Sequence, residues 1–231
     1  MITVRNAQDR GHANLGWLES KHTFSFGHYH DPKHMGFSAL RVINDDIVKP
    51  GAGFGTHGHR DMEIVSYVLE GTIEHKDSEG NVQVLPAGEF QLMSAGRGIY
   101  HSEYNASQNE NLKFLQIWIQ PNTFGKTPGY QQKNFGKENG LTLIASPDGN
   151  DGALSIKQDA SLYQLILDAG QSIDFDIEDG RNVYLHQIRG KLQIDNTVIE
   201  AGSGAKIEQQ NKVRFMNGQQ EQVTALLFDL P

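Results

Sequence analysis

Two short motifs each place a pair of potential metal ligands two residues apart. The first is His57-Gly58-His59 and the second is His101-Ser102-Glu103. In a β-strand, residues two apart point to the same face of the sheet. Two such strands facing one interior would present three imidazoles and one carboxylate to a single ion. Ligands of this kind suit iron, manganese, nickel, cobalt or copper, with coordination positions left open for a further ligand.

The histidines are concentrated in the first half of the chain. Nine of the ten lie at or before residue 101, and only His186 follows. A third pair, His28-Tyr29-His30, precedes Asp31-Pro32, a sequence typical of a turn, and has no second pair to complete a site. We therefore expect a metal only at the first two motifs. Because coordination requires neutral imidazole, metal loading should fall as the pH drops through roughly 6–7.

Composition excludes several other kinds of chemistry. The 231 residues include no Cys, which rules out disulfides, thiolate zinc sites, iron–sulfur clusters and a cysteine nucleophile. With 20 Lys and Arg against 28 Asp and Glu, the net charge of −8 argues against direct binding of nucleic acid. The glycine-rich segment 51–55 lacks the Lys-Ser/Thr of a phosphate-binding loop.

The chain shows no targeting or membrane signal. Its first residues contain no apolar stretch resembling a signal peptide. No uninterrupted apolar run approaches the roughly 20 residues that span a bilayer. We expect a cytoplasmic protein that does not enter the membrane.

Short apolar segments alternate with turn signals along most of the chain, which predicts an all-β protein. The strands expected in the first half are 38–43, 63–69, 72–75, 81–85, 90–93 and 112–119, with Asn44-Asp45-Asp46 ending the first of them. Those expected in the second half are 141–145, 161–167, 183–188, 191–194 and 224–228. The polar stretch 120–140 between the two sets is interpreted as a connection.

An internal repeat predicts two domains of like fold. The rhythm of 67–73, an apolar strand running into glycine and a second strand, recurs at 184–192, and an Ala-Gly turn follows each copy at 87–88 and 201–202. We place the N-terminal, metal-binding domain at 1–133 and the C-terminal domain at 134–231. When the two copies of the repeat are aligned without gaps, the positions equivalent to the four candidate ligands are Asp176, Glu178, Phe215 and Asn217. No histidine lies near them, so the second domain is expected to be metal-free.

The spacing of these residues resembles a known superfamily. Gly51-x5-His57-x-His59-x3-Glu63-x7-Gly71 resembles the first cupin motif, and Gly80-x5-Pro86-x-Gly88 resembles the start of the second. The usual second-motif histidine would fall at Gln91 but arrives at His101, and that departure resembles the pirin branch of the cupins. The segments 10–18, 22–26, 35–46 and 94–103 are also pirin-like. The resemblance covers residues 5–121 strongly and the remainder by pattern.

The resemblance implies a bicupin, with two β-barrel domains of the double-stranded β-helix or jelly-roll type. It implies one mononuclear divalent metal in the N-terminal domain, with Fe(II) as the usual ion and Mn, Ni, Co, Cu and Zn as alternatives. The matching ligand positions are His57, His59, His101 and Glu103. Glu63 is a rival carboxylate, since other cupins use the one that follows His-x-His, or it orients a histidine ring by accepting a hydrogen bond.

The resemblance also implies a function. Similar bacterial chains are known as quercetin 2,3-dioxygenases, and animal pirins are known as nuclear transcription co-regulators. We therefore expect a metal-dependent dioxygenase that opens the central ring of a flavonol such as quercetin with O2, with Glu103 as both ligand and catalytic base. The alternative is a redox-responsive metal-binding regulator that acts through a protein partner. Other cupin chemistry, such as isomerisation or sugar binding, is a third interpretation.

Overall fold

The computed structural model describes every residue from Met1 to Pro231 and contains β-strands with two 3-10 helices and no α-helix. The chain divides into two compact units. One comprises Gly11–Gly136 with Ile156–Gln158, and the other comprises Met1–Arg10, Lys137–Ser155 and Asp159–Pro231. Neither helix has the length and apolar character that crossing a membrane requires.

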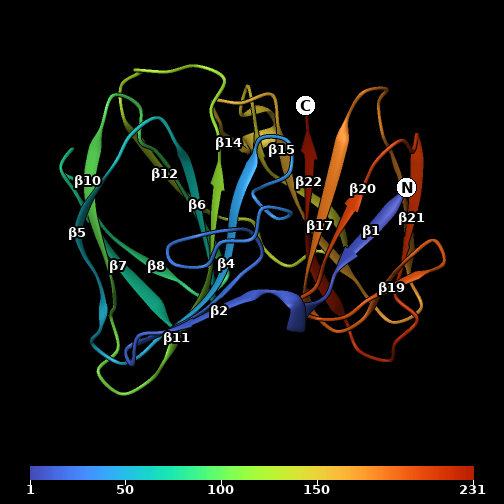
Figure 1. Ribbon diagram of the computed structural model, residues 1–231, viewed down its shortest axis with the longest axis horizontal. Coiled ribbons are helices and arrows are strands. Elements are labelled where there is room, and N and C mark those ends of the chain that lie inside the picture. The colour runs from blue at the N-terminus through green and yellow to red at the C-terminus, as the bar shows by residue number, and fades with distance from the viewer. The chain divides into compact units, whose positions relative to one another are not determined.

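The unit containing Gly11–Gly136, called here the N-terminal unit, has two antiparallel sheets (Figure 1). The seven-stranded sheet has, in spatial order, β12 (Gly129–Asn134), β9 (Glu89–Ser94), β6 (Glu63–Glu70), β11 (Leu112–Ile119), β4 (Leu40–Val48), β3 (Leu18–His22) and β2 (Gly11–Asn14). The four-stranded sheet has β5 (Gly53–His59), β10 (Ile99–Asn105), β7 (Thr72–Asp77) and β8 (Val82–Pro86).

The two sheets of this unit pack face to face over an apolar core. Leu18, Val48 and Phe114 from the large sheet form one buried cluster with Ile73 and Leu85 from the small sheet. The alternation of strand side chains brings these residues to the inner faces, as in other sandwiches. The all-β, jelly-roll expectation is confirmed, although the sheets remain separate and do not close into a barrel.

The other unit, called here the C-terminal unit, repeats this arrangement. Its seven-stranded sheet has β1 (Ile2–Arg5), β20 (Gly204–Ile207), β17 (Asn182–Arg189), β22 (Val223–Leu230), β15 (Ser161–Leu167), β13 (Gly140–Ser146) and β14 (Leu154–Ser155). Its four-stranded sheet has β16 (Ser172–Asp176), β21 (Lys212–Met216), β18 (Leu192–Ile194) and β19 (Thr197–Ile199). The 3-10 helices are η1 (Ala7–Asp9) and η2 (Asn150–Gly152). A single pairing, β13 with β14, is parallel.

The N-terminal strand belongs to the C-terminal unit. β1 pairs antiparallel with β20, with Ile2 opposite Ile207 and Arg5 opposite Gly204. Residues Met1–Arg10 therefore group with the strands at the other end of the sequence. The division at 133/134 stays a prediction, and this long-range pairing is a feature that the sequence did not indicate.

Two local expectations about strands are wrong. β4 does not end at Asn44-Asp45-Asp46 but runs through to Val48, because Asn44 and Asp46 point inward and find polar partners there. The stretch 120–140 is not only a connection, since β12 lies within it and pairs with β9. Hydrogen bonds supplied by distant strands outweigh the local turn preference of these polar residues.

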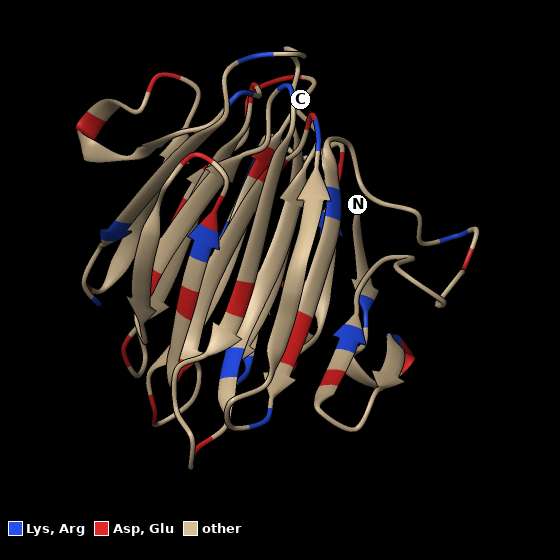
Figure 2. Cartoon of the chain, turned by 90° about the vertical axis from the view of Figure 1, so that its left-hand side faces the viewer, with Lys and Arg blue, Asp and Glu red and all other residues tan.

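Charged residues of both signs are interspersed on the strands that face the viewer in Figure 2. Several of these strands carry both basic and acidic positions.

Candidate metal centre

The two ligand motifs lie on neighbouring strands of the small sheet. β10 pairs with β5 so that His101 lies directly opposite His57. His59 lies two residues further along β5 and shares the face of His57. The pairing therefore brings together side chains that are more than forty residues apart in the sequence, as the two i, i+2 motifs predict.

Glu103 shares the face of His101 by the alternation of β10, and the pairing with β5 is irregular beside it. The register shifts between His101 and Glu103, so that Glu103 lies opposite Phe54 and β5 has one extra residue. A bulge of this kind re-aims side chains and is common beside functional sites. Gly53 makes the close approach feasible, since a Cβ there would lie 2.3 Å from the carbonyl oxygen of Glu103.

The three imidazoles converge on one point. His101 Nε2 lies 3.0 Å from His59 Nε2 and 3.1 Å from His57 Nε2. His57 Nδ1 lies 2.7 Å from the carbonyl oxygen of Gly55, an acceptor, so the proton of this ring is assigned to Nδ1 and the lone pair of Nε2 faces the cluster. His101 is buried, whereas His57 and His59 are partly exposed.

Burial makes protonation of two of these imidazoles unfavourable. It lowers the pKa of His59 to about 4, with further contributions from the neighbouring His101 and His57. It lowers the pKa of His101 to about 3, and here His57 and His75 add to the effect. Both imidazoles are therefore neutral at physiological pH, which is the state that coordinates metals.

Glu103 is buried and anchored through one of its two oxygens. Oε1 accepts a hydrogen bond of 3.2 Å from Ser66 Oγ and one of 3.4 Å from Gln91 Nε2. Gln91 is itself 3.1 Å, through its Oε1, from the hydroxyl of Tyr130. Oε2 is buried and has no hydrogen-bond partner in the protein.

These residues fit a divalent cation. His101 Nε2 cannot make good hydrogen bonds to both of its neighbours, because a neutral ring offers either one N–H or one lone pair at that atom. A buried carboxylate oxygen without a partner is also costly. A cation would satisfy the converging lone pairs of the three histidines, and nitrogen with oxygen donors suits the middle and late first-row metals. Glu103 shares a ligand group with His101 but not with His57 or His59.

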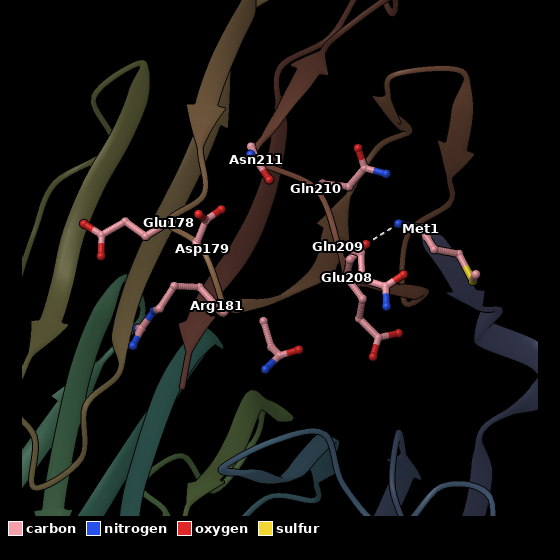
Figure 3. A pocket seen from close by; sticks show the side chains of 10 residues that line it. Met1, Glu178, Asp179, Arg181, Glu208, Gln209, Gln210 and Asn211 are labelled. Atoms are coloured by element: carbon pink, nitrogen blue, oxygen red, sulfur yellow. Dashed lines mark hydrogen bonds between the residues drawn. The ribbon is translucent and has the colours of Figure 1, made fainter.

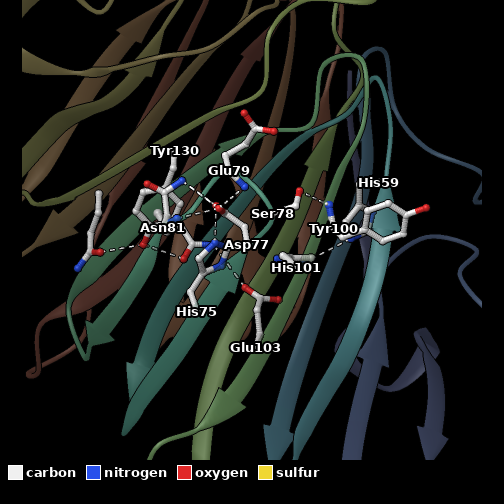
Figure 4. A network of polar contacts seen from close by, with 12 residues as sticks. His59, His75, Asp77, Ser78, Glu79, Asn81, Tyr100, His101, Glu103 and Tyr130 are labelled. Carbon is white, nitrogen blue, oxygen red and sulfur yellow. Dashed lines mark hydrogen bonds and ion pairs between the residues drawn. The ribbon is translucent and has the colours of Figure 1, made fainter.

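A second group of potential ligands shares His101 with the first. His75, His101 and Glu103 offer ligand atoms within 4.8 Å of one another, and all three are buried. His75 Nε2 lies 3.0 Å from Asp77 Oδ2, inside the network drawn in Figure 4. Asp77 also accepts hydrogen bonds from the backbone of Glu79 and from Asn81. The sequence motifs did not single out this pair, although His75 and Asp77 repeat the i, i+2 spacing.

The remaining candidates lie elsewhere. Glu63 is buried but belongs to neither ligand group, and its Oε2 accepts hydrogen bonds from Ser94 Oγ (2.8 Å) and the backbone N–H of Lys157 (3.2 Å). Burial raises its pKa, and these hydrogen bonds partly oppose the effect. His28 lies in a turn and His30 just after it, and both are exposed.

A row of buried polar side chains crosses the inner face of the large sheet. Consecutive members are cross-strand partners, and the row comprises His22, Asn44, Gln116, Ser66 and Gln91, here called the inner polar row. Its last two members hold Glu103, and its first two are joined by a 2.8 Å contact between His22 Nδ1 and Asn44 Oδ1. The row has no signature in the sequence, because each strand contributes only one such residue.

The corresponding interior of the C-terminal unit is different. Its core is apolar, and Phe215, one of the positions equivalent to a ligand, is fully buried in it. A cavity of about 380 Å³ lies at the surface of this unit and is lined by acidic, amide and arginine side chains, including Glu178, Asp179 and Arg181 (Figure 3). No histidine lines it.

The fold and the centre together define a bicupin protein whose histidine cluster lies in the N-terminal unit. Comparison with known proteins makes this more specific. Residues 3–119 match the family model described as Pirin, and residues 143–230 match that of the quercetinase C-terminal cupin domain. The chain belongs to the pirin family.

Several relatives match over their whole length. Quercetin 2,3-dioxygenase of Escherichia coli K12 is 49% identical over 231 residues, covering 100% of this chain and 99% of the relative. The pirin-like protein YhaK of the same organism is 37% identical, with 100% of each chain covered. The crystal structure of the E. coli pirin YhhW in complex with nickel(II) has a TM-score of 0.96 at 48% identity, covering 100% of this chain and 99% of that one.

Proposed function

We propose that this protein is a metal-dependent dioxygenase that opens the central ring of a flavonol such as quercetin with O2. The observation that carries the proposal is that the Nε2 atoms of His57 and His59 both lie within 3.1 Å of His101 Nε2. Glu103, whose Oε2 has no hydrogen-bond partner, forms the adjoining ligand group with His101 and His75. The dioxygenase name of the E. coli relative supports the reaction class.

His57, His59, His101 and Glu103 would hold the ion, for which we propose Fe(II), and the nickel in the E. coli pirin supports a divalent site. When bound, the metal would supply Lewis-acid polarisation of a substrate hydroxyl, which lowers the pKa of that hydroxyl. The role of the histidines is then to hold the ion, and burial keeps the nitrogen atoms of His59 and His101 neutral for that purpose.

Glu103 is proposed as the base that accepts the proton of the flavonol 3-hydroxyl. Its Oε1 is held by Ser66 and Gln91, which leaves Oε2 as the oxygen without a hydrogen-bond partner, and this is the atom proposed to accept the proton. A general base must lie within hydrogen-bond reach of the proton that it removes, and its orientation must be fixed. Ser66 and Gln91 provide that orientation from the inner polar row.

The overall reaction balances without a further reductant. Two carbon–carbon bonds of the central ring break, one on each side of the carbon that bears the 3-hydroxyl, and that carbon leaves as carbon monoxide. The two atoms of O2 end on the two flanking carbons, giving a depside, which is an ester of two phenolic acids. O2 is reduced and the flavonol is oxidised.

The direct test is decay of the flavonol absorption band with matched O2 uptake, using protein loaded with Fe(II), Ni²⁺ or Mn²⁺ and protein stripped by a chelator. We expect turnover only in loaded protein. No flavonol consumption above the metal-salt blank with any of these ions would overturn the proposal and favour the redox-responsive regulator.

Two variants distinguish a residue that only binds the metal from one that also accepts the substrate proton. His101→Ala should lower metal content and turnover together, because a ligand is lost. Glu103→Gln should reduce turnover by about 10²–10⁴, the usual contribution of a general base, and reduce metal content less. Some loss of metal is expected. If the Gln side chain keeps the hydrogen bonds from Ser66 and Gln91 through its oxygen, its NH2 group takes the place of Oε2 and points toward the cluster. Normal turnover by fully loaded Glu103→Gln would show that Glu103 is not the base.

A further inference from the structure

A cavity of about 410 Å³ in the N-terminal unit is lined by residues that the metal centre does not use. Its volume falls within the range of small-molecule sites, about 300–1,000 Å³. The aromatic part of its lining comprises His22, Phe26, Tyr29 and Phe54, and the buried polar part comprises Ser20, Asn44, Asp46 and Gln116. A flat aromatic ring that carries a polar group matches this combination.

The cavity adjoins the metal centre through shared aromatic contacts. The ring of Phe54 lies 6.4 Å from that of His57. On another side, the ring of Phe26 lies 5.4 Å from that of Trp118, which lies 5.0 Å from that of His59. The cavity and the histidine cluster are therefore neighbours, with these aromatic rings between them.

Asp46 is the feature of the cavity that indicates a ligand. The residue is 3% exposed, and its Oδ1 is buried without a hydrogen-bond partner in the protein. Its side chain is hydrogen-bonded to Ser20, and no cationic side chain is paired with it. Burial, more than the neighbouring Asp45 and Glu103, raises the pKa of Asp46 to about 7. A buried carboxyl group without a full set of partners is costly, and such groups are concentrated at functional sites.

The residues around Asp46 orient it. Asp46 lies on β4 opposite Ser20 of β3 and Phe114 of β11, one pair away from the inner polar row. Ser20 Oγ is also 3.3 Å from His22 Nδ1, which contacts Asn44. The carboxyl group is thus held by neighbours on the same sheet, and its Oδ1 has no hydrogen-bond partner in the protein.

We propose, building on the flavonol dioxygenase function, that this cavity binds the pendant phenyl ring of the substrate and that Asp46 accepts a hydrogen bond from a hydroxyl group on that ring. The ring would pack against Phe26, Tyr29 and Phe54, and its hydroxyl would satisfy Asp46 Oδ1. Asp46 is therefore a specificity-determining residue that selects flavonols hydroxylated on this ring.

The test compares two flavonols that share the reacting end and differ only in the pendant ring. Quercetin carries two hydroxyls on that ring, and galangin carries none. Binding is measured by titration calorimetry on metal-free protein, so the readout does not depend on turnover. Loss of one hydrogen bond to a buried group corresponds to about a tenfold change in affinity, so the wild type should bind quercetin about tenfold more tightly than galangin.

The variants assign this preference to Asp46. Asp46→Leu should bring the quercetin-to-galangin ratio close to one and leave galangin binding within about threefold of the wild type. Asp45→Leu, on the same strand but pointing to the other face, is the matched control and should keep the wild-type ratio. Circular dichroism of each variant establishes that it folds. If Asp46→Leu does not fold, the wild-type ratio alone decides, because a ratio near one overturns the proposal.

The outcomes separate this proposal from the function on which it rests. Turnover of both flavonols with equal affinities would retain the dioxygenase and overturn the role of Asp46. A preference that depends on Asp46 but no turnover by loaded protein would retain the binding site and overturn the dioxygenase. A preference that survives in Asp46→Leu would also overturn the role of Asp46.

Discussion

Replacing Asp46 by Asn should stabilise the protein at alkaline pH, because the native fold keeps this carboxyl group buried. Its pKa is about 7 in the folded protein against an ordinary value of 3.8, and burial is the main cause. The unfolded chain therefore releases the proton at lower pH than the folded chain does. Stability linked to Asp46 is fully present below about pH 4 and is lost as the pH rises through 7.

The size of the effect follows from that difference. About three pH units at about 1.4 kcal/mol each give a cost of roughly 4 kcal/mol at pH 8. The Asn side chain is neutral at every pH and can still bond to Ser20. We expect Asp46→Asn to raise the free energy of unfolding by about 2–4 kcal/mol at pH 8 and to leave it almost unchanged near pH 4.

The assay is urea unfolding of metal-free protein followed by tryptophan fluorescence. The only two tryptophans, Trp17 and Trp118, lie in the N-terminal unit, so the signal reports the unit that contains Asp46. Asp45→Asn serves as the control and should change the stability by less than about 0.5 kcal/mol. A gain that is equal at pH 4 and pH 8, or no gain at pH 8, would refute the reasoning. A stabilising substitution at this position would also indicate that Asp46 is kept for function at the expense of stability.

Two further predictions concern the metal centre and its surroundings. Because burial lowers the pKa of His59 to about 4 and that of His101 to about 3, neither competes for a proton between pH 5 and 7. The logarithm of the Kd for Ni²⁺, measured by calorimetry, should therefore change by no more than about one per pH unit in this range. This dependence is less steep than three freely titrating histidines would give, and a slope near three would contradict the burial of the cluster. Asp77→Ala removes the carboxylate of the buried His75–Asp77 pair and should lower the free energy of unfolding by about 3 kcal/mol. Glu79 is an exposed neighbour, and Glu79→Ala should lower the free energy of unfolding by less than about 0.5 kcal/mol in the same urea assay. Equal effects of the two substitutions would contradict the role of the pair.

The sequence by itself determined the chemistry of the proposed centre and the fold class. Strand periodicity is local, so the sequence alone assigns His57-x-His59 and His101-x-Glu103 to one face of a strand each. The same periodicity, with regular turn signals, predicted most strands, including Leu112–Ile119 and Ser161–Leu167 with correct bounds. The pirin-like motifs supplied the family, which the comparisons confirm.

The tertiary structure decided how distant strands complete that chemistry. The bulge that sets Glu103 opposite Phe54 depends on the register between β5 and β10, which no single segment encodes. The partners of Glu103, Ser66 and Gln91, come from two strands of the facing sheet, and each is an isolated polar residue in an apolar segment.

The strand through Asn44-Asp45-Asp46 shows most clearly why local sequence could not predict these features. By local propensity these residues favour a turn, because their short polar side chains hydrogen-bond to nearby backbone groups. In the fold, His22 and Ser20 on the adjacent strand supply partners for Asn44 and Asp46, so an extended conformation satisfies them better. Local sequence specifies which side chains alternate on a strand, whereas hydrogen bonds across strands, available only after the sheets assemble, decide which buried polar residues are tolerated and where they point.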